Sequence, residues 1–166
     1  MQFVQKISGL TLAVLLGVFS VKAEARDLTH RLAVGIKNNT SLNLPSVGGI
    51  YYADKDMAFT GIFGIDTEKN NSAMQAGAGV RKVVFFENNL NAYWTGQAAF
   101  VSTDTLVAGK NSGIDAFVGG GVEFFFSGLE NLSFSVEAGV GVSSLHNTRL
   151  YTSAQDPFHA GIMFYF

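Results

Sequence analysis

Apolar residues occupy every second position in several long segments of this 166-residue chain. In residues 132–144, apolar side chains recur at alternate positions from Leu132 to Val142, with serine, glutamate and glycine between them. Successive side chains of a β-strand point to opposite faces, so this period of two predicts strands whose faces meet different surroundings. No helix-length apolar stripe follows Arg26. The pattern therefore predicts an all-β fold.

Eight segments carry this alternation, and long polar connections between them alternate with short ones. Outer-membrane barrels are built in this way, with long outer loops and short periplasmic turns. Each segment has about nine or more residues, enough for a tilted strand to cross a bilayer. We therefore predict an eight-stranded antiparallel up-and-down transmembrane β-barrel. The predicted strands are residues 29–38, 46–54, 57–66, 72–86, 90–102, 113–126, 132–144 and 157–166. The long connections are residues 39–45, 67–71, 103–111 and 145–156, and the short ones are 55–56, 87–89 and 127–131.

The 19 glycines and the low charged fraction of 14% fit a closed barrel. A bilayer offers no water to unpaired backbone groups, so a sheet inside it must close on itself. Eight strands leave an interior only just wide enough for side chains, so inward positions must be small or polar. The alternative is a soluble β-sandwich in which the glycines mark bulges. The glycines expected to face inward are Gly77, Gly79, Gly119, Gly121, Gly139, Gly141 and Gly161.

Residues 1–25 have the pattern of a cleaved secretory signal peptide. A lysine precedes an uncharged, mostly apolar run, and Ala23-Glu24-Ala25 supplies the A-x-A end of a cleavage site. The apolar run is short for a membrane-spanning helix, which needs about 20 residues. An uncleaved anchor is the alternative. We expect cleavage after Ala25, or after Ala23, and a barrel domain at residues 26–166 in a bacterial outer membrane.

Charge and cysteine content exclude several other classes of protein. The formal net charge is −2 at pH 7, and the chain has no cysteine. Nucleic-acid binders rely on clustered Lys and Arg, so no nucleic-acid partner is expected. Disulfides, thiolate metal sites and cysteine nucleophiles are excluded as well. Because His30, His146 and His159 are dispersed, we expect neither a metal site nor a cofactor.

Charged residues on the inward face predict an ion cluster inside the barrel. Arg81 and Glu137 lie at similar distances from the predicted periplasmic turns, and Arg31 and Glu123 lie slightly closer to them. Buried unpaired charge is costly, so these two cations and two carboxylates should meet and pair. We expect a salt-bridged plug in the lumen. A proton-linked gate or a small pore is the alternative.

A second set of residues has the composition of a catalytic triad. The alternation of inward and outward side chains in the neighbouring strands predicts that three residues point outward near the extracellular rim: Ser144, His146 and Asp156. A nucleophile, a base and an orienting acid could hydrolyse an ester. The set is loosely similar to that of the outer-membrane lipid A deacylases, although that family's His-x-Ser order is reversed here. Loop-edge residues hydrogen-bonded to water are the non-catalytic alternative.

The final strand carries the resemblance to a known group. Its outward residues alternate up to a terminal aromatic, which resembles the last strand of bacterial outer-membrane barrels, the segment read by the barrel-insertion machinery. With this last strand, the predicted signal peptide and the strand count taken together, the chain resembles the small OmpA/OmpX-like barrels over nearly its whole mature length. The resemblance implies that these residues form a C-terminal insertion signal: Phe158, Ile162, Phe164 and Phe166.

Two further expectations concern the outer surface. The alternation along residues 72–86 places Lys82 on the lipid-facing side. Either its side chain extends toward the periplasmic headgroups, or a bulge near Val83 resets the register. Aromatic residues at strand ends are typical of the interfacial girdles of membrane barrels. The residues assigned to this girdle are Tyr51, Tyr52, Tyr93, Trp94 and Tyr151.

The sequence favours a non-enzymatic role, in membrane integrity or in surface interaction through residues 103–111 and 145–156. A lipid A-modifying hydrolase at the rim is the enzymatic alternative. A narrow channel for small solutes is a further alternative, opposed by expected interior bulk from Phe117, Phe125, Met163 and Tyr165. The expected partners are outer-membrane lipids, lipopolysaccharide and, during biogenesis, the barrel-insertion machinery. We expect a monomer.

Overall fold

The computed structural model describes residues 27–38, 40–42, 44–107, 109–153 and 159–166, and these form nine strand segments. This described part contains no helix that is long and apolar enough to cross a membrane. The predicted signal peptide lies outside it. The strands are β1 (Leu32–Asn38), β2 (Ser46–Tyr52), β3 (Met57–Asp66), β4 (Asn71–Glu87), β5 (Leu90–Thr105), β6 (Gly109–Phe126), β7 (Leu129–Ser143), β8 (Arg149–Thr152) and β9 (His159–Tyr165).

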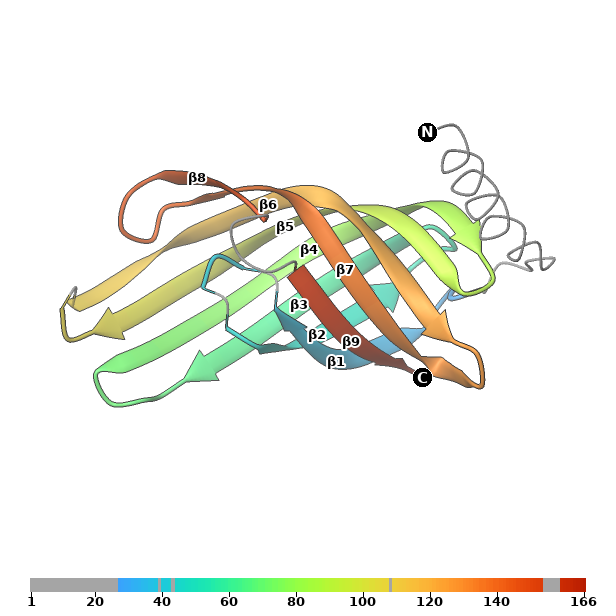
Figure 1. Ribbon diagram of the computed structural model, residues 1–166, viewed down its shortest axis with the longest axis horizontal. Coiled ribbons are helices and arrows are strands. Elements are labelled where there is room, and N and C mark those ends of the chain that lie inside the picture. The colour runs from blue at the N-terminus through green and yellow to red at the C-terminus, as the bar shows by residue number, and fades with distance from the viewer. Residues whose placement is uncertain (1–26, 39, 43, 108, 154–158) are drawn as a thin grey trace, which may run out of the picture.

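The sheet closes into an antiparallel barrel with eight positions in its wall (Figure 1). Consecutive strands pair from β1 to β7, and β9 lies between β7 and β1. The closing pairs run from Ala33 opposite Tyr165 to Asn38 opposite Ala160. The prediction of an eight-stranded antiparallel barrel is confirmed, and the sandwich alternative is wrong. We call the end where β1 begins and β9 finishes the terminal end, and the opposite end the distal end.

The eighth wall position is formed by two separate strands, β8 and β9, whereas the sequence pattern predicted one. β8 pairs with the distal part of β7, where Val140 is opposite Thr152, whereas β9 pairs with the remainder, where Glu137 is opposite His159. The chain between Thr152 and His159 is longer than the matching stretch of β7, so the strand cannot continue in register. The prediction of residues 145–156 as a single loop is therefore wrong, because β8 lies within it.

The predicted long loop at residues 103–111 is also wrong. β5 continues to Thr105 and β6 starts at Gly109, and their pairing extends from Leu90 opposite Phe124 to Thr105 opposite Gly109. Its threonine, aspartate and asparagine residues were read as loop residues, but cross-strand pairing accommodates them in the longest hairpin of the barrel.

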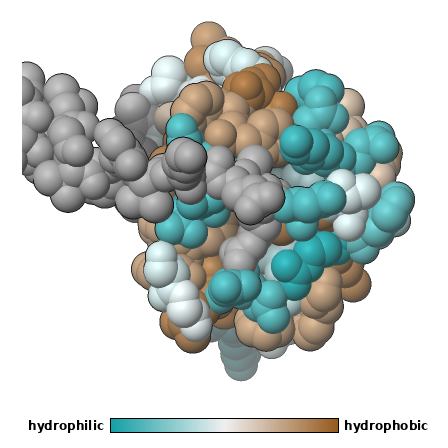
Figure 2. All heavy atoms as spheres, turned by 90° about the vertical axis from the view of Figure 1, so that its right-hand side faces the viewer, coloured by the Kyte–Doolittle hydropathy of each residue, from teal (hydrophilic) through white to brown (hydrophobic). Residues whose placement is uncertain are grey.

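Apolar side chains cover the outside of the wall. Figure 2 looks onto the terminal end, where hydrophobic residues occupy much of the periphery and hydrophilic ones lie across the end face. Large aliphatic and aromatic residues remain about half exposed on all the long strands, in contrast to the usual arrangement of a water-soluble protein. Examples of these outward residues are Ile36, Val47, Phe59, Phe63, Val80, Trp94, Phe100, Ile114, Val118, Val140 and Ile162.

Glycines on the inward face leave room for large side chains that lie across the lumen. A Cβ at Gly121 would be 2.6 Å from the ring of Tyr93, and one at Gly141 would be 2.3 Å from the ring of Tyr151. At Gly48 the neighbour is the Lys37 side chain, at 2.8 Å. The small residues predicted inside the barrel therefore make space for the residues that fill it.

The bulge that was considered near Val83 is present, but it does not move Lys82 to the inner face. The register of β4 shifts between Val83 and Phe85, which marks a β-bulge. Lys82 nevertheless remains outside, where its ammonium group pairs with Asp56 in the turn between β2 and β3. The bulge therefore resets the strand beyond Lys82.

Candidate functional site: the closed lumen

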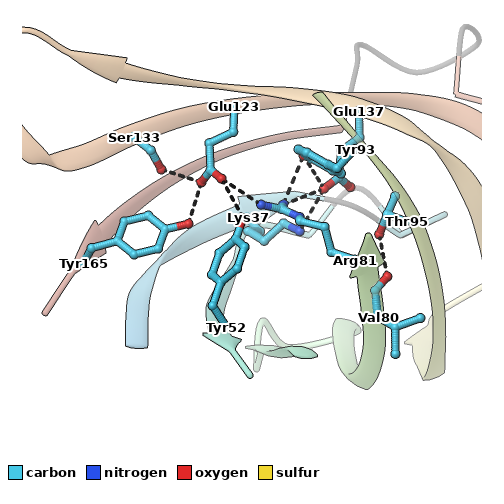
Figure 3. Close-up of polar contacts among 10 residues, drawn as sticks. All are labelled: Lys37, Tyr52, Val80, Arg81, Tyr93, Thr95, Glu123, Ser133, Glu137 and Tyr165. Atoms are coloured by element: carbon cyan, nitrogen blue, oxygen red, sulfur yellow. Dashed lines mark hydrogen bonds and ion pairs between the residues drawn. The ribbon is translucent and has the colours of Figure 1, made fainter. Parts of the chain in front are cut away.

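An ion network crosses the terminal half of the lumen (Figure 3). The two terminal nitrogens of Arg81, on β4, lie 3.1 Å from Glu123 Oε2 on β6 and 3.1 Å from Glu137 Oε1 on β7. Arg81 and Glu123 are fully buried, and Glu137 is nearly so. One guanidinium group thus joins β4 to strands two and three positions further along the wall, and its planar fork suits two carboxylates at once.

Lys37 is a fourth charged member of this network. Its ammonium donates to Glu137 Oε1 over 3.3 Å, and the side chain is only 2% exposed. Lys37 faces the lumen from β1, and its depth relative to Arg81 depends on the stagger between β1 and β4. With Lys37 included, two cations face two carboxylates, so the buried charges balance.

Arg31 does not join the cluster to which it was assigned, and this correction has a simple cause. It lies just before β1, at the terminal end, where it is partly exposed. Its guanidinium donates to the Phe166 carbonyl over 3.2 Å and to Asn131 Oδ1 over 2.8 Å. Arg31 therefore ties Phe166 to the beginning of β7.

Tyrosine hydroxyls complete the coordination of both carboxylates. Tyr93 donates to Glu137 over 2.9 Å and accepts from Arg81 over 3.0 Å, and its ring lies 3.7 Å from the guanidinium carbon. Glu123 accepts from Tyr165 over 2.8 Å and from Tyr52 over 3.3 Å. Ser133 adds a fourth side-chain partner to Glu123, at 2.7 Å.

The assignment of three tyrosines to the interfacial girdle is therefore wrong. Tyr52, Tyr93 and Tyr151 are between 0% and 5% exposed and point into the lumen, whereas Tyr51 and Trp94 are 42% and 62% exposed and point outward. The alternation already contained this signal, because Tyr93 and Trp94 are consecutive and must face opposite sides. The predicted interior positions of Phe117, Phe125, Met163 and Tyr165 are confirmed.

A loop, rather than strand residues alone, fills the distal half of the lumen. The connection from β1 to β2 folds inward, and Thr40 is only 4% exposed. Gln75, on β4 and fully buried, accepts from the Thr40 hydroxyl and donates to the Leu44 carbonyl over 2.8 Å and to the Ser46 hydroxyl. The Ser41 hydroxyl reaches Ser143 on β7, over 3.2 Å.

Apolar contacts hold the same loop against the far wall. Leu42 packs on a cluster formed by Ile62, Ala99 and Val101 from β3 and β5. Gly64 leaves the space, since a Cβ there would be 2.0 Å from Ser46 Oγ. We call described residues 40–42 and 44–46 the inner loop. The expectation that residues 39–45 form an outward-projecting connection is corrected for its described members.

The proposed rim triad is not assembled in the described residues. The Ser144 hydroxyl accepts from the Ile114 amide over 2.9 Å and donates to the Ile114 carbonyl over 3.2 Å, which secures the adjacent strand end. No hydrogen bond joins Ser144 to the exposed His146. Asp156 lies outside the described residues, as does Phe158 of the C-terminal signal. Ile162, Phe164 and Phe166 point outward, with 46% to 68% of their surface exposed.

No group of three potential ligands drawn from His, Asp and Glu is gathered within reach of a metal ion in the described ranges. The carboxylates of the lumen are instead occupied by cations and hydroxyls. The site is therefore organised as a closed network of side chains, and the fold defines a closed eight-stranded barrel of the outer-membrane type.

Comparisons with known proteins agree with that class. The chain is similar in structure to the N-terminal β-barrel domain of Pseudomonas aeruginosa OprF, with a TM-score of 0.62 and 12% sequence identity. The match covers 83% of this chain and 98% of that domain. No protein-family model matches the sequence, and no curated protein matches it. At this identity the likeness establishes the fold alone.

Proposed function

We propose that this protein is an integral outer-membrane β-barrel whose lumen is closed and whose role is structural or is exerted at its surface. The observation that carries the proposal is an apolar outer wall around an interior filled by a hydrogen-bonded ion network and by the inner loop. A barrel in lipid needs an apolar outside and a closed ring of backbone hydrogen bonds. The likeness to the OprF barrel domain supports the same assignment.

The biogenesis that we propose follows from the ends of the chain. Residues 1–25 would direct export, with cleavage after Ala25 or Ala23. Phe158, Ile162, Phe164 and Phe166 would present the last strand to the barrel-insertion machinery. Outer-membrane lipids and lipopolysaccharide would then surround a monomeric barrel.

The closed interior opposes a role as a channel. Arg81, Glu123 and Glu137 join three strands across the terminal half, and the inner loop occupies the distal half. A solute would have to break buried ion pairs and displace the inner loop. We therefore expect no single-channel conductance above background for the purified protein in planar bilayers. Sustained discrete conductance steps would contradict the proposal.

The hydrolase alternative receives no support from the rim, because Ser144 already exchanges two hydrogen bonds with the Ile114 backbone. Lipid A mass spectrometry with and without the protein tests this alternative directly. We expect identical acylation patterns. Loss of an acyl chain that depends on Ser144 would contradict the proposal.

The sole tryptophan offers a test of membrane insertion. Trp94 is 62% exposed on the outer wall, so in vesicles its ring should contact acyl chains. We expect a blue-shifted emission that brominated lipids quench, together with a folded band that moves differently on detergent gels from the boiled chain. Unquenched emission and one mobility before and after boiling would contradict a transmembrane barrel.

A further inference from the structure

The hairpin of β7 and β8 carries two hollows on opposite faces at the distal end. Val142 is paired with Leu150, and both point outward, whereas the next pair, Ser143 with Arg149, has the opposite parity. β8 has β7 as its single strand neighbour in the described part of the chain. A molecule at this edge can therefore contact both faces of the hairpin.

The first hollow is polar and lacks acidic residues. It is an open cavity of about 290 Å³, lined by Ser41, Ser143, Leu145, His146, Asn147 and Arg149. Arg149 is exposed, and among the described residues no carboxylate pairs with it; its guanidinium lies 5.4 Å from the ring centre of Tyr151. A cation surrounded by hydroxyl, amide and imidazole groups suits an anion that accepts several hydrogen bonds.

The second hollow is apolar and faces the expected lipid. It is a groove of about 230 Å³ between β6 and β7, lined by Ala116, Phe117, Val118, Val140, Gly141, Val142 and Leu150. Leu150 is 75% exposed beside it. Ala116 keeps the groove open, since its exposed side chain does not extend beyond a Cβ. A linear acyl chain matches this shape and polarity.

We propose that this hairpin binds one anionic phospholipid or glycolipid of the outer leaflet, with its phosphate at Arg149 and an acyl chain along the groove beside Leu150. This inference rests on the proposed outer-membrane location. Arginine is well suited to phosphate, because its planar fork forms two charge-assisted hydrogen bonds. His146 and Asn147, at the tip of the hairpin, supply further donors above the groove. The absence of acidic residues from both linings fits an anionic occupant.

The test uses the full chain folded in vesicles that contain equal amounts of phosphatidylglycerol and phosphatidylcholine with identical acyl chains. Native mass spectrometry after mild detergent extraction counts the lipids that remain bound. We expect phosphatidylglycerol to be retained about tenfold over phosphatidylcholine, equivalent to the loss of one charged contact. Arg149→Gln should remove this preference, and Leu150→Ser should lower retention of both lipids.

Lys110→Gln is the matched control, because Lys110 is an exposed cation at the distal end of β6 and lines neither hollow. It should leave the preference unchanged. Equal losses in the Lys110 and Arg149 variants, or an unchanged preference in Arg149→Gln, would overturn the site. Full displacement of the lipid by millimolar inorganic phosphate would also overturn it, since a soluble anion would then suffice.

Heat-dependent gel mobility, measured on the same samples, separates the two proposals. A folded, heat-sensitive band without lipid preference overturns the lipid site and leaves the barrel assignment intact. Absence of that band overturns the outer-membrane assignment, and the lipid site fails with it.

Discussion

The two halves of the lumen are closed by different means. In the terminal half, charged and phenolic side chains on strands reach across the barrel and pair around Arg81. In the distal half, a loop is held by neutral hydrogen bonds to Gln75 and by contacts of Leu42. The terminal network is thus part of the wall, whereas the distal seal is a separate segment lying within it.

This difference predicts different responses to damage. Breaking the terminal network leaves buried charge without a partner inside a wall that cannot move away. Breaking the distal seal frees a short segment that can leave the lumen for water, and local opening of this kind costs less than global unfolding. Variants in each half of the lumen, and one at the outer surface, should therefore differ in their cost to stability.

Arg81→Met should lower the free energy of unfolding by about 3–5 kcal/mol, because it leaves the buried Glu123 without a cation and leaves Glu137 with Lys37 alone. Urea titration of the protein folded in vesicles, followed by gel mobility, measures the change. Replacing Lys37 and Arg81 by Met together with Glu123 and Glu137 by Gln should recover much of the loss, since no unpaired charge would remain. If the quadruple variant were no more stable than Arg81→Met, unpaired charge would not be the main cause of the lost stability.

Gln75→Leu should lower stability less, by about 2–3 kcal/mol, because Leu44 and Thr40 lose their hydrogen-bond partner. The decisive measurement is hydrogen exchange. Amides of the inner loop should exchange faster, while those of β6 and β7 around Glu123 remain protected. Equal acceleration in both regions would contradict the independence of the two halves.

Gly64→Ala should displace the inner loop, since the new Cβ would meet Ser46 Oγ at 2.0 Å. Ser46 must then rotate away from Gln75, at a cost of about 1–2 kcal/mol. Gly61→Ala is the matched control on the same strand, where the nearest atom is 3.9 Å away. If the two variants were equally stable, the steric explanation for Gly64 would be contradicted.

Asp56→Asn should have the smallest effect, because Asp56 and Lys82 form their ion pair at the exposed outer surface. The hydrogen bond from Lys82 lowers the pKa of Asp56 below its usual value. A depressed acid pKa stabilises the fold at pH values above about 4, and the contribution is lost as pH falls through the lowered value. Wild type and variant should therefore converge at low pH, and also at high salt; a difference that persists under both conditions would contradict this account.

The fold could be predicted from the sequence because parity is a local property. Residues 132–144 reveal their two faces without knowledge of any partner strand, and the same holds for the strands near Arg81 and Glu123. Strand ends were less predictable. Thr103, Asp104 and Thr105 look like loop residues, but they continue β5 in a long hairpin.

The site was partly predictable for a related reason. Arg81, Glu123 and Glu137 could be grouped by parity and by depth counted from short turns. The exclusion of Arg31 and the inclusion of Lys37 depend on the stagger between strands, which no local pattern encodes. The inner loop could not be predicted, because its inward path depends on Gln75 and Gly64, which lie on other strands.

The interrupted eighth wall position has a consequence for the order of folding. The barrel is closed by β1 and β9, each seven residues long, which pair across nearly the full length of the chain. Contacts of such high sequence separation form slowly, because the chain must first bring its ends together. The hairpins from β3 to β7 can form before that, so we expect the β1–β9 seam to be the last part of the cylinder to close and the first to separate under force.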